Sequence, residues 1–267
     1  GEEGHGIREF IHHMTHYIRM DFGVAPVGIM RRALTLACHH VRNRSAFGRR
    51  IADLPQMKNV LADLALEWEA SLLLGMRMAA ALDNERQSAR DRHLLRVGVP
   101  IAKFWNCKRA NHFVLEALEC HGGMGFVEEQ PIARLLREAP LNSIWEGTSA
   151  MMGLDFARSV RRSPETKDAL LAEINAGSSG NGLFKQFATS LEEEIGRAGN
   201  DLEPHARRLM SKAAVCLQAS LLYRHAPVEV ADLFVASRMG REASLEFGTL
   251  PSEGLVLARI ADRAVPA

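Results

Sequence analysis

Residues 137–148 read REAPLNSIWEGT. A large aromatic residue is followed there by a carboxylate, Glu146, and by Gly147, just before a helical pattern begins. Gly147 permits close approach of the backbone to a flat ligand, and Thr148 can cap the following helix or donate to a ligand oxygen. A glutamate held in apolar surroundings has a raised pKa and can act as a base near neutral pH. Taken alone, a glutamate at a helix start is more often a favourable partner of the helix dipole.

Two upstream motifs contain residue types that suit a phosphate. Residues 42–48 read RNRSAFG, and residues 119–126 read ECHGGMGF. Guanidinium groups offer several donors in a fixed fork, and a glycine-rich turn lets backbone amides reach a ligand. Each motif alone is weak, because arginines at helix ends are usually solvated and glycine turns usually just stop a helix. We expect Gly48 to form a left-handed helix cap.

Between these motifs, apolar residues recur at spacings of three and four, whereas strand signals are scarce. Pro26 should kink the first helix without ending it, and Asp53 should cap the second, with Pro55 in its first turn. We expect helices at about 7–46, 53–83, 89–120, 131–137, from the Glu146 motif to 161, and at 165–176, 183–196, 203–224 and 227–240. The predicted fold is all-α: an up-and-down helical bundle over residues 1–160 and a helical C-terminal extension over residues 161–267.

In this order and spacing, the three motifs resemble the C-terminal helical domain of the acyl-CoA dehydrogenase family, over roughly residues 4–160. Residues 137–147 resemble the AidB-type branch, the alkylation-response flavoproteins, whose members also carry a helical extension. The resemblance implies an FAD-dependent oxidoreductase that removes two hydrogens from an acyl thioester. A glutamate takes the alpha proton, and the flavin takes the beta hydride. It also implies an N-terminal helical domain and a β-barrel, so this chain alone should be inactive.

The resemblance assigns roles to individual residues. Glu146 matches the catalytic base, and Arg44 matches an arginine that holds the FAD pyrophosphate of a neighbouring subunit. Phe47 would pack on the adenine side, while Gly122, Gly123 and Thr148 match positions near the FAD adenosine and pyrophosphate. Arg19 is a candidate substrate contact, because it matches an arginine that follows the base in some members.

The chain also departs from the family pattern. Ile18 occupies the alternative base position, which leaves Glu146 as the candidate base. His16 replaces an aspartate that helps to hold CoA. Pro55 and Glu119 each replace a glutamine, and an anion at position 119 would repel a pyrophosphate unless arginines offset it.

Charge and composition favour a protein without bulk affinity for nucleic acid or membranes. The net charge is +1, and the four cysteines form no CxxC pair, which indicates reduced thiols and a cytoplasmic protein. We expect no metal site, because His12, His13 and His16 lack an evident third ligand. Expected partners are further copies of the chain, as a dimer or tetramer, and an acyl-CoA-like substrate.

An alternative is that the protein acts mainly as a DNA-binding or protective flavoprotein with little dehydrogenase activity. Residues 161–267 hold 13 Lys and Arg against 14 Asp and Glu, which does not predict a strong phosphate-binding surface. A local patch from Arg207, Arg208, Lys212 and Arg224 could still contact DNA.

Overall fold

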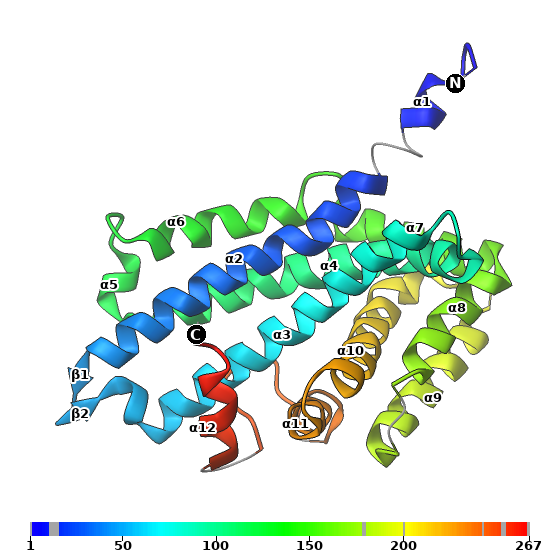
Figure 1. The fold of residues 1–267 in the computed structure, drawn as a ribbon. Coiled ribbons are helices and arrows are strands. Elements are labelled where there is room, and N and C mark those ends of the chain that lie inside the picture. Colours follow the sequence, from blue (N-terminus) through cyan, green and yellow to red (C-terminus); the bar gives the residue numbers. More distant parts are fainter. Residues whose placement is uncertain are drawn as a thin grey trace.

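The computed structural model describes residues 2–10, 16–177, 180–199, 201–241, 243–251 and 255–265. It confirms the all-α prediction (Figure 1). The α-helices are α1 (Gly6–Glu9), α2 (His16–Asn43), α3 (Pro55–Asn84), α4 (Ala89–Glu119), α5 (Gly123–Phe126), α6 (Pro131–Glu138), α7 (Ser149–Arg162), α8 (Pro164–Asn175), α9 (Gly182–Ala198), α10 (Ala206–His225), α11 (Val228–Met239) and α12 (Leu255–Asp262). Short 3₁₀ helices are η2 (Ile51–Asp53), η3 (Ala139–Ser143) and η4 (Glu203–His205).

The long helices α2, α3 and α4 pack against one another and form the centre of the molecule (Figure 1). Helices α7, α8 and α10 pack on α4, and α12 packs on α3. One apolar cluster runs from Met30 in α2 to Ala264 after α12, so the bundle and the residues after 160 share a core. The division at residue 160 remains a prediction.

Helix α2 continues through Pro26, as predicted. A proline has no N–H, so the carbonyl four residues earlier loses its helical partner. The Phe22 carbonyl lies at that position, and it accepts a hydrogen bond from the Cys107 thiol on α4 at 3.3 Å. A neighbouring helix therefore replaces the missing donor.

Three local predictions about the segment after α2 are wrong, and one helix near the end of the chain was not predicted. Helix α2 ends at Asn43, and a hairpin of β1 (Ser45–Ala46) and β2 (Arg49–Arg50) follows. Gly48 has a φ of 76°, but it lies in the hairpin loop and caps no helix. Asp53 does not cap α3, whose N-cap is Leu54. Helix α12 was not expected at all.

A buried ionic cluster joins α11 to the bundle. Asp63 and Glu67 on α3 are almost fully buried. Arg238 on α11 bonds to both carboxylates, and Arg109 on α4 holds Glu67 through two bonds of 3.0 and 3.2 Å. Burial alone would raise the pKa of Glu67, but the two arginines outweigh burial and hold it below its ordinary value. The last third of the chain thus supplies a counter-charge that the bundle needs.

A second cluster surrounds Glu173 on α8. Arg77 on α3 donates to this buried carboxylate at 2.8 and 3.0 Å, and Arg224 on α10 donates at 2.6 Å. Arg90 on α4 donates to it as well, at 3.4 Å. Four helices therefore converge on one carboxylate, which fixes α8 and α10 against α3 and α4.

Candidate functional site

Glu146 lies in a turn between η3 and α7 with a backbone φ of 55°, in the left-handed region that favours glycine. Lys103 on α4 points at this turn and is 1% exposed. Its ammonium donates to the carbonyl oxygens of Trp145 at 2.8 Å and Gly147 at 2.6 Å. One buried cation therefore holds both residues that flank Glu146 and offsets the cost of the strained backbone.

Arg19 on α2 holds the third carbonyl of the same turn. Its Nε donates to the Glu146 oxygen at 2.9 Å, and its Nη1 pairs with Asp155 on α7 at 3.2 Å. Asp155 also accepts from Arg96 on α4 at 2.6 Å. The guanidinium that we predicted as a substrate contact is thus bonded to the backbone of the Glu146 turn and to Asp155.

The side chains around the turn leave Glu146 half-buried beside an aromatic pair. The rings of Phe22 and Trp145 lie 4.8 Å apart between centroids. Burial is the main cause that lowers the pKa of Lys103, and Arg19 adds to it. Thr148 is the N-cap residue of α7, and its exposed hydroxyl makes no capping bond. The hydroxyl is therefore available to a ligand.

The opposite end of α2 carries the predicted phosphate-binding residues. Phe47 occupies the hairpin tip with a φ of 52° and is 92% exposed. Within the described ranges, the exposed Arg44 side chain has no hydrogen bond or ion pair. Both side chains are therefore accessible on the surface of this chain.

The glycine turn lies at this same end. The ring of His121 is 4.8 Å from that of His40 near the end of α2. Gly122 has a φ of 59°, and a Cβ on Gly122 or Gly123 would meet nothing within 4 Å. The backbone is therefore open to a flat or extended ligand there.

The predicted site residues form two groups within one chain. Glu146, Thr148 and Arg19 lie together at one end of α2, and Arg44, Phe47, Gly122 and Gly123 lie at the other. From Arg19 to His40, α2 spans roughly 30 Å at about 1.5 Å per residue. The predicted residues therefore form two separate groups at opposite ends of α2 in one chain.

The sequence did not reveal Lys103 and Asp155 as site residues. Lys103 follows a run of apolar residues on α4, and a buried lysine in such a run is a signal, because buried lysines are rare unless paired. Asp155 carried no comparable signal, since its partners Arg19 and Arg96 are distant in sequence.

Three of the four cations of the predicted DNA patch are paired. Arg208 and Lys212 both bond to Glu194, and Arg224 bonds to Glu173. Among the described residues there is no group of three His, Cys, Asp or Glu side chains suited to a metal. His12 and His13 lie outside the described residues, as does the side chain of His16. None of the described helices is long and apolar enough to cross a membrane.

The all-α bundle agrees with the class that the sequence motifs predict, a C-terminal domain of the acyl-CoA dehydrogenase type. A family model, "Acyl-CoA dehydrogenase, C-terminal domain", matches residues 4–161. The chain belongs to this family.

The similarity extends beyond the matched domain. AidB of Escherichia coli (strain K12), which carries an acyl-CoA dehydrogenase name, is 36% identical over 202 residues, or 76% of this chain and 37% of AidB. The solved structure titled Bd2924 apo-form has a TM-score of 0.76 at 29% identity and covers 84% of this chain and 44% of its own. ACDH-11 of Caenorhabditis elegans in complex with C11-CoA has a TM-score of 0.75 at 22% identity, over 99% of this chain and 44% of its own, and shows the fold alone. The chain spans less than half of each of these proteins.

Proposed function

We propose that the intact protein is an FAD-dependent acyl-CoA dehydrogenase-like oxidoreductase, and that this chain supplies its catalytic base, Glu146. The observation that carries the proposal is the turn of Trp145, Glu146 and Gly147, whose three carbonyls bond to Lys103 and Arg19 and which we call the clamped turn. Buried Lys103 holds the carbonyls on both sides of the strained Glu146, and part-buried Arg19 holds the carbonyl of Glu146 itself. A backbone fixed in this way presents one side chain in one direction.

Glu146 and the two cations that bond to its turn have different roles. Glu146 takes the alpha proton of an acyl thioester, while Lys103 and Arg19 keep its backbone fixed. The paired rings of Phe22 and Trp145 lie next to the turn and limit the access of water. A bound flavin would supply the acceptor for the beta hydride, so that the double bond forms between the alpha and beta carbons.

The residues at the other end of α2 fit the adenosine and pyrophosphate part of FAD. Arg44 offers an unpaired guanidinium, Phe47 an exposed ring, and Gly122 and Gly123 an open backbone. Because these groups lie far from Glu146 in the same chain, they would hold the cofactor of a second copy.

A homo-oligomer, a dimer or a tetramer, follows from this arrangement. Phe126 and Met124 on α5 are 82% and 50% exposed and lie at the same end as the 92% exposed Phe47. Exposed large apolar residues that gather at one end are typical of a protein interface.

DNA binding remains the second reading, and the observed ion pairs weaken it. A protein that neutralises phosphates needs free cations, whereas Arg208, Lys212 and Arg224 are bonded to carboxylates. Titration of duplex DNA at two salt concentrations tests this reading, which requires salt-sensitive binding.

Glu146→Gln in the intact protein tests the base. We expect acyl-CoA turnover to fall by about a hundredfold or more, since general bases contribute about 10²–10⁴, with the flavin absorbance unchanged. Glu138→Gln, at an exposed glutamate on α6, is the matched control and should keep the parent rate. Parent-level turnover in Glu146→Gln would show that the base assignment is wrong.

A further inference from the structure

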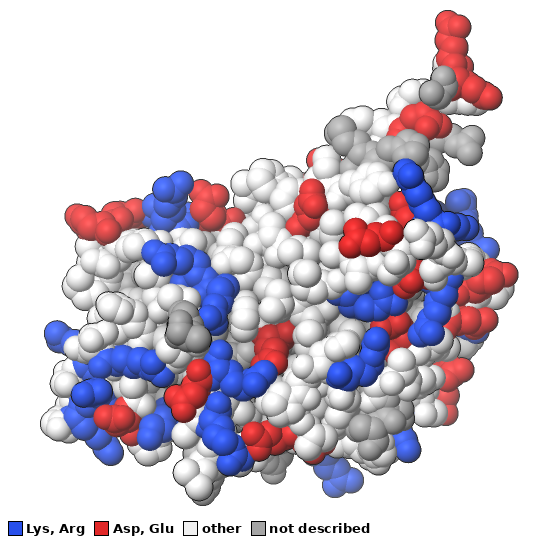
Figure 2. Space-filling model, in the orientation of Figure 1, with Lys and Arg blue, Asp and Glu red and all other residues white. Residues whose placement is uncertain are grey.

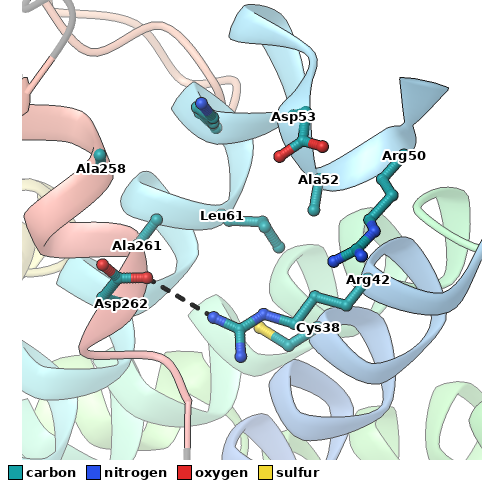
Figure 3. A pocket seen from close by; sticks show the side chains of 10 residues that line it. Cys38, Arg42, Arg50, Ala52, Asp53, Leu61, Ala258, Ala261 and Asp262 are labelled. Atoms are coloured by element: carbon teal, nitrogen blue, oxygen red, sulfur yellow. Dashed lines mark ion pairs between the residues drawn. The ribbon is translucent and has the colours of Figure 1, made fainter.

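A cavity of about 410 Å³ lies where the end of α2, β2, η2 and the start of α3 face α12 (Figure 3). Its lining is divided between apolar and charged residues. The apolar residues are Cys38, Ala52, Leu61, Ala258 and Ala261, and the charged residues are Arg42, Arg50, Asp53, Lys58 and Asp262. Its volume lies within the range of small-molecule sites, which measure about 300–1,000 Å³, and half of its ten lining residues are charged.

Positive charge exceeds negative charge in the cavity. Arg42 pairs with Asp262 across it at 3.5 Å, and Figure 3 shows Arg50 reaching toward the same space. Among the residues that the structure describes, neither Arg50 nor Lys58 has an ion pair or a side-chain hydrogen bond. Figure 2 shows several Lys and Arg side chains on this part of the surface, with Asp and Glu side chains among them. Within the described ranges, Asp53 has no ion pair or side-chain hydrogen bond either, so the unpaired charges of the lining are two positive and one negative. This net positive charge beside an apolar wall favours an anion with an apolar body.

Contacts outside the cavity fix its α12 wall. Arg31 on α2 donates to the Ala264 carbonyl at 3.0 Å, and Arg263 pairs with Glu69 on α3. The buried face of α12 includes Leu257 and Ile260. The wall is thus held in place without a ligand, which reduces the ordering cost of binding.

We propose that this cavity binds a small phosphorylated molecule, with its phosphate between Arg50 and Lys58 and its apolar body against Leu61 and Ala261. Arg42 becomes a third phosphate donor when it exchanges Asp262 for the ligand. Neither Arg44 nor the glycine turn lines the cavity, so it is separate from the proposed FAD contacts, and the inference does not depend on the proposed dehydrogenase activity.

Calorimetric titration of the intact protein with AMP tests the site, with adenosine and inorganic phosphate as reference probes. AMP should bind, adenosine should not, and phosphate should bind more weakly than AMP. Arg50→Ala and Lys58→Ala should each weaken AMP binding about tenfold, because each removes one charge-assisted contact. Arg49→Ala, at the exposed neighbour outside the cavity, is the control and should bind as the parent does.

Asp262→Asn provides a gain-of-function check that a merely structural role would not produce. It releases Arg42 and removes an anion, so AMP should bind several-fold more tightly, on the order of a threefold gain. Equal binding of adenosine and AMP, or AMP binding that Arg50→Ala and Lys58→Ala leave unchanged, overturns the proposal. Loss of AMP binding in Arg44→Ala alone would place the ligand at the flavin contacts. Duplex DNA binding with the same Arg50 and Lys58 dependence would replace the small molecule by nucleic acid.

Discussion

The candidate functional residues at the two ends of α2 differ in how many partners they have within the chain. At the Glu146 end, the ammonium of Lys103 and the guanidinium of Arg19 bond to three consecutive backbone carbonyls. At the hairpin end, Arg44 and Phe47 are exposed, and the glycine turn faces open space.

The difference separates two kinds of functional residue. The carboxylate of a catalytic base must keep its position within a fraction of an ångström, so the contacts that support it lie within the chain. Groups that hold a cofactor of another subunit gain their partners only on assembly. The first end can therefore be tested by kinetics in an assembled enzyme, and the second by stability and association.

Lys103→Met should produce the largest effect, because it leaves the carbonyls of Trp145 and Gly147 without their donor. We expect kcat to fall about a hundredfold through misplacement of Glu146, while circular dichroism and flavin content stay at the parent level. Lys108→Met, five residues further along α4, is the control. An unchanged kcat in Lys103→Met would show that the bonds from Lys103 to the turn do not position Glu146.

The clamp also predicts an alkaline limit to turnover. Burial, with Arg19 adding to it, lowers the pKa of Lys103 below its ordinary 10.5. As pH rises through that lowered pKa, the ammonium loses its charge and the two carbonyls lose a charge-assisted donor, so kcat should decline at a pH below 10.5. The residual kcat of Lys103→Met should show no such decline at alkaline pH. If kcat declines in the same way in both proteins, a different titrating group causes the decline.

Gly122→Ala should have a smaller effect, confined to the hairpin end. Its φ of 59° and ψ of −145° suit glycine alone, so alanine should lower the free energy of unfolding by about 1–3 kcal/mol. Gly123→Ala, at a helical position without positive φ, is the matched control and should change little. Chemical denaturation measures both, and equal losses would contradict the backbone argument.

Phe47→Ala should have the smallest effect on the folded chain, below about 0.5 kcal/mol, because the ring is exposed. Its loss should instead weaken association and flavin retention, measured by sedimentation and absorbance. A substantial loss of stability with unchanged association would mean that the ring packs within its own chain.

The sequence predicted the long helices well, because their apolar periodicity is strong and local. Helices α3 and α4 begin and end within two residues of expectation. The hairpin was missed because strands of two residues carry no alternation to read. Helix α12 was missed although Leu257, Ile260 and Ala261 have helical spacing, since it follows a segment without clear periodicity.

The candidate site was predictable only in part. Glu146 and Thr148 were predicted because they belong to one short motif of adjacent residues. Lys103 acts on a turn about forty positions later, and no local pattern encodes a contact across that separation. The wide spacing between the two groups along α2 likewise came from the tertiary arrangement.

Asp63 and Glu67 are sealed within the bundle, yet Arg238, one of their counter-charges, comes from far beyond residue 161. Without the last third of the chain, Asp63 would lose the Arg238 guanidinium and the Gly248 N–H, and Glu67 would keep Arg109 alone. A buried carboxylate stripped of its counter-charge destabilises a fold by about 3–5 kcal/mol. The final helices thus act as an ionic plug for the bundle as well as a cover for its apolar face.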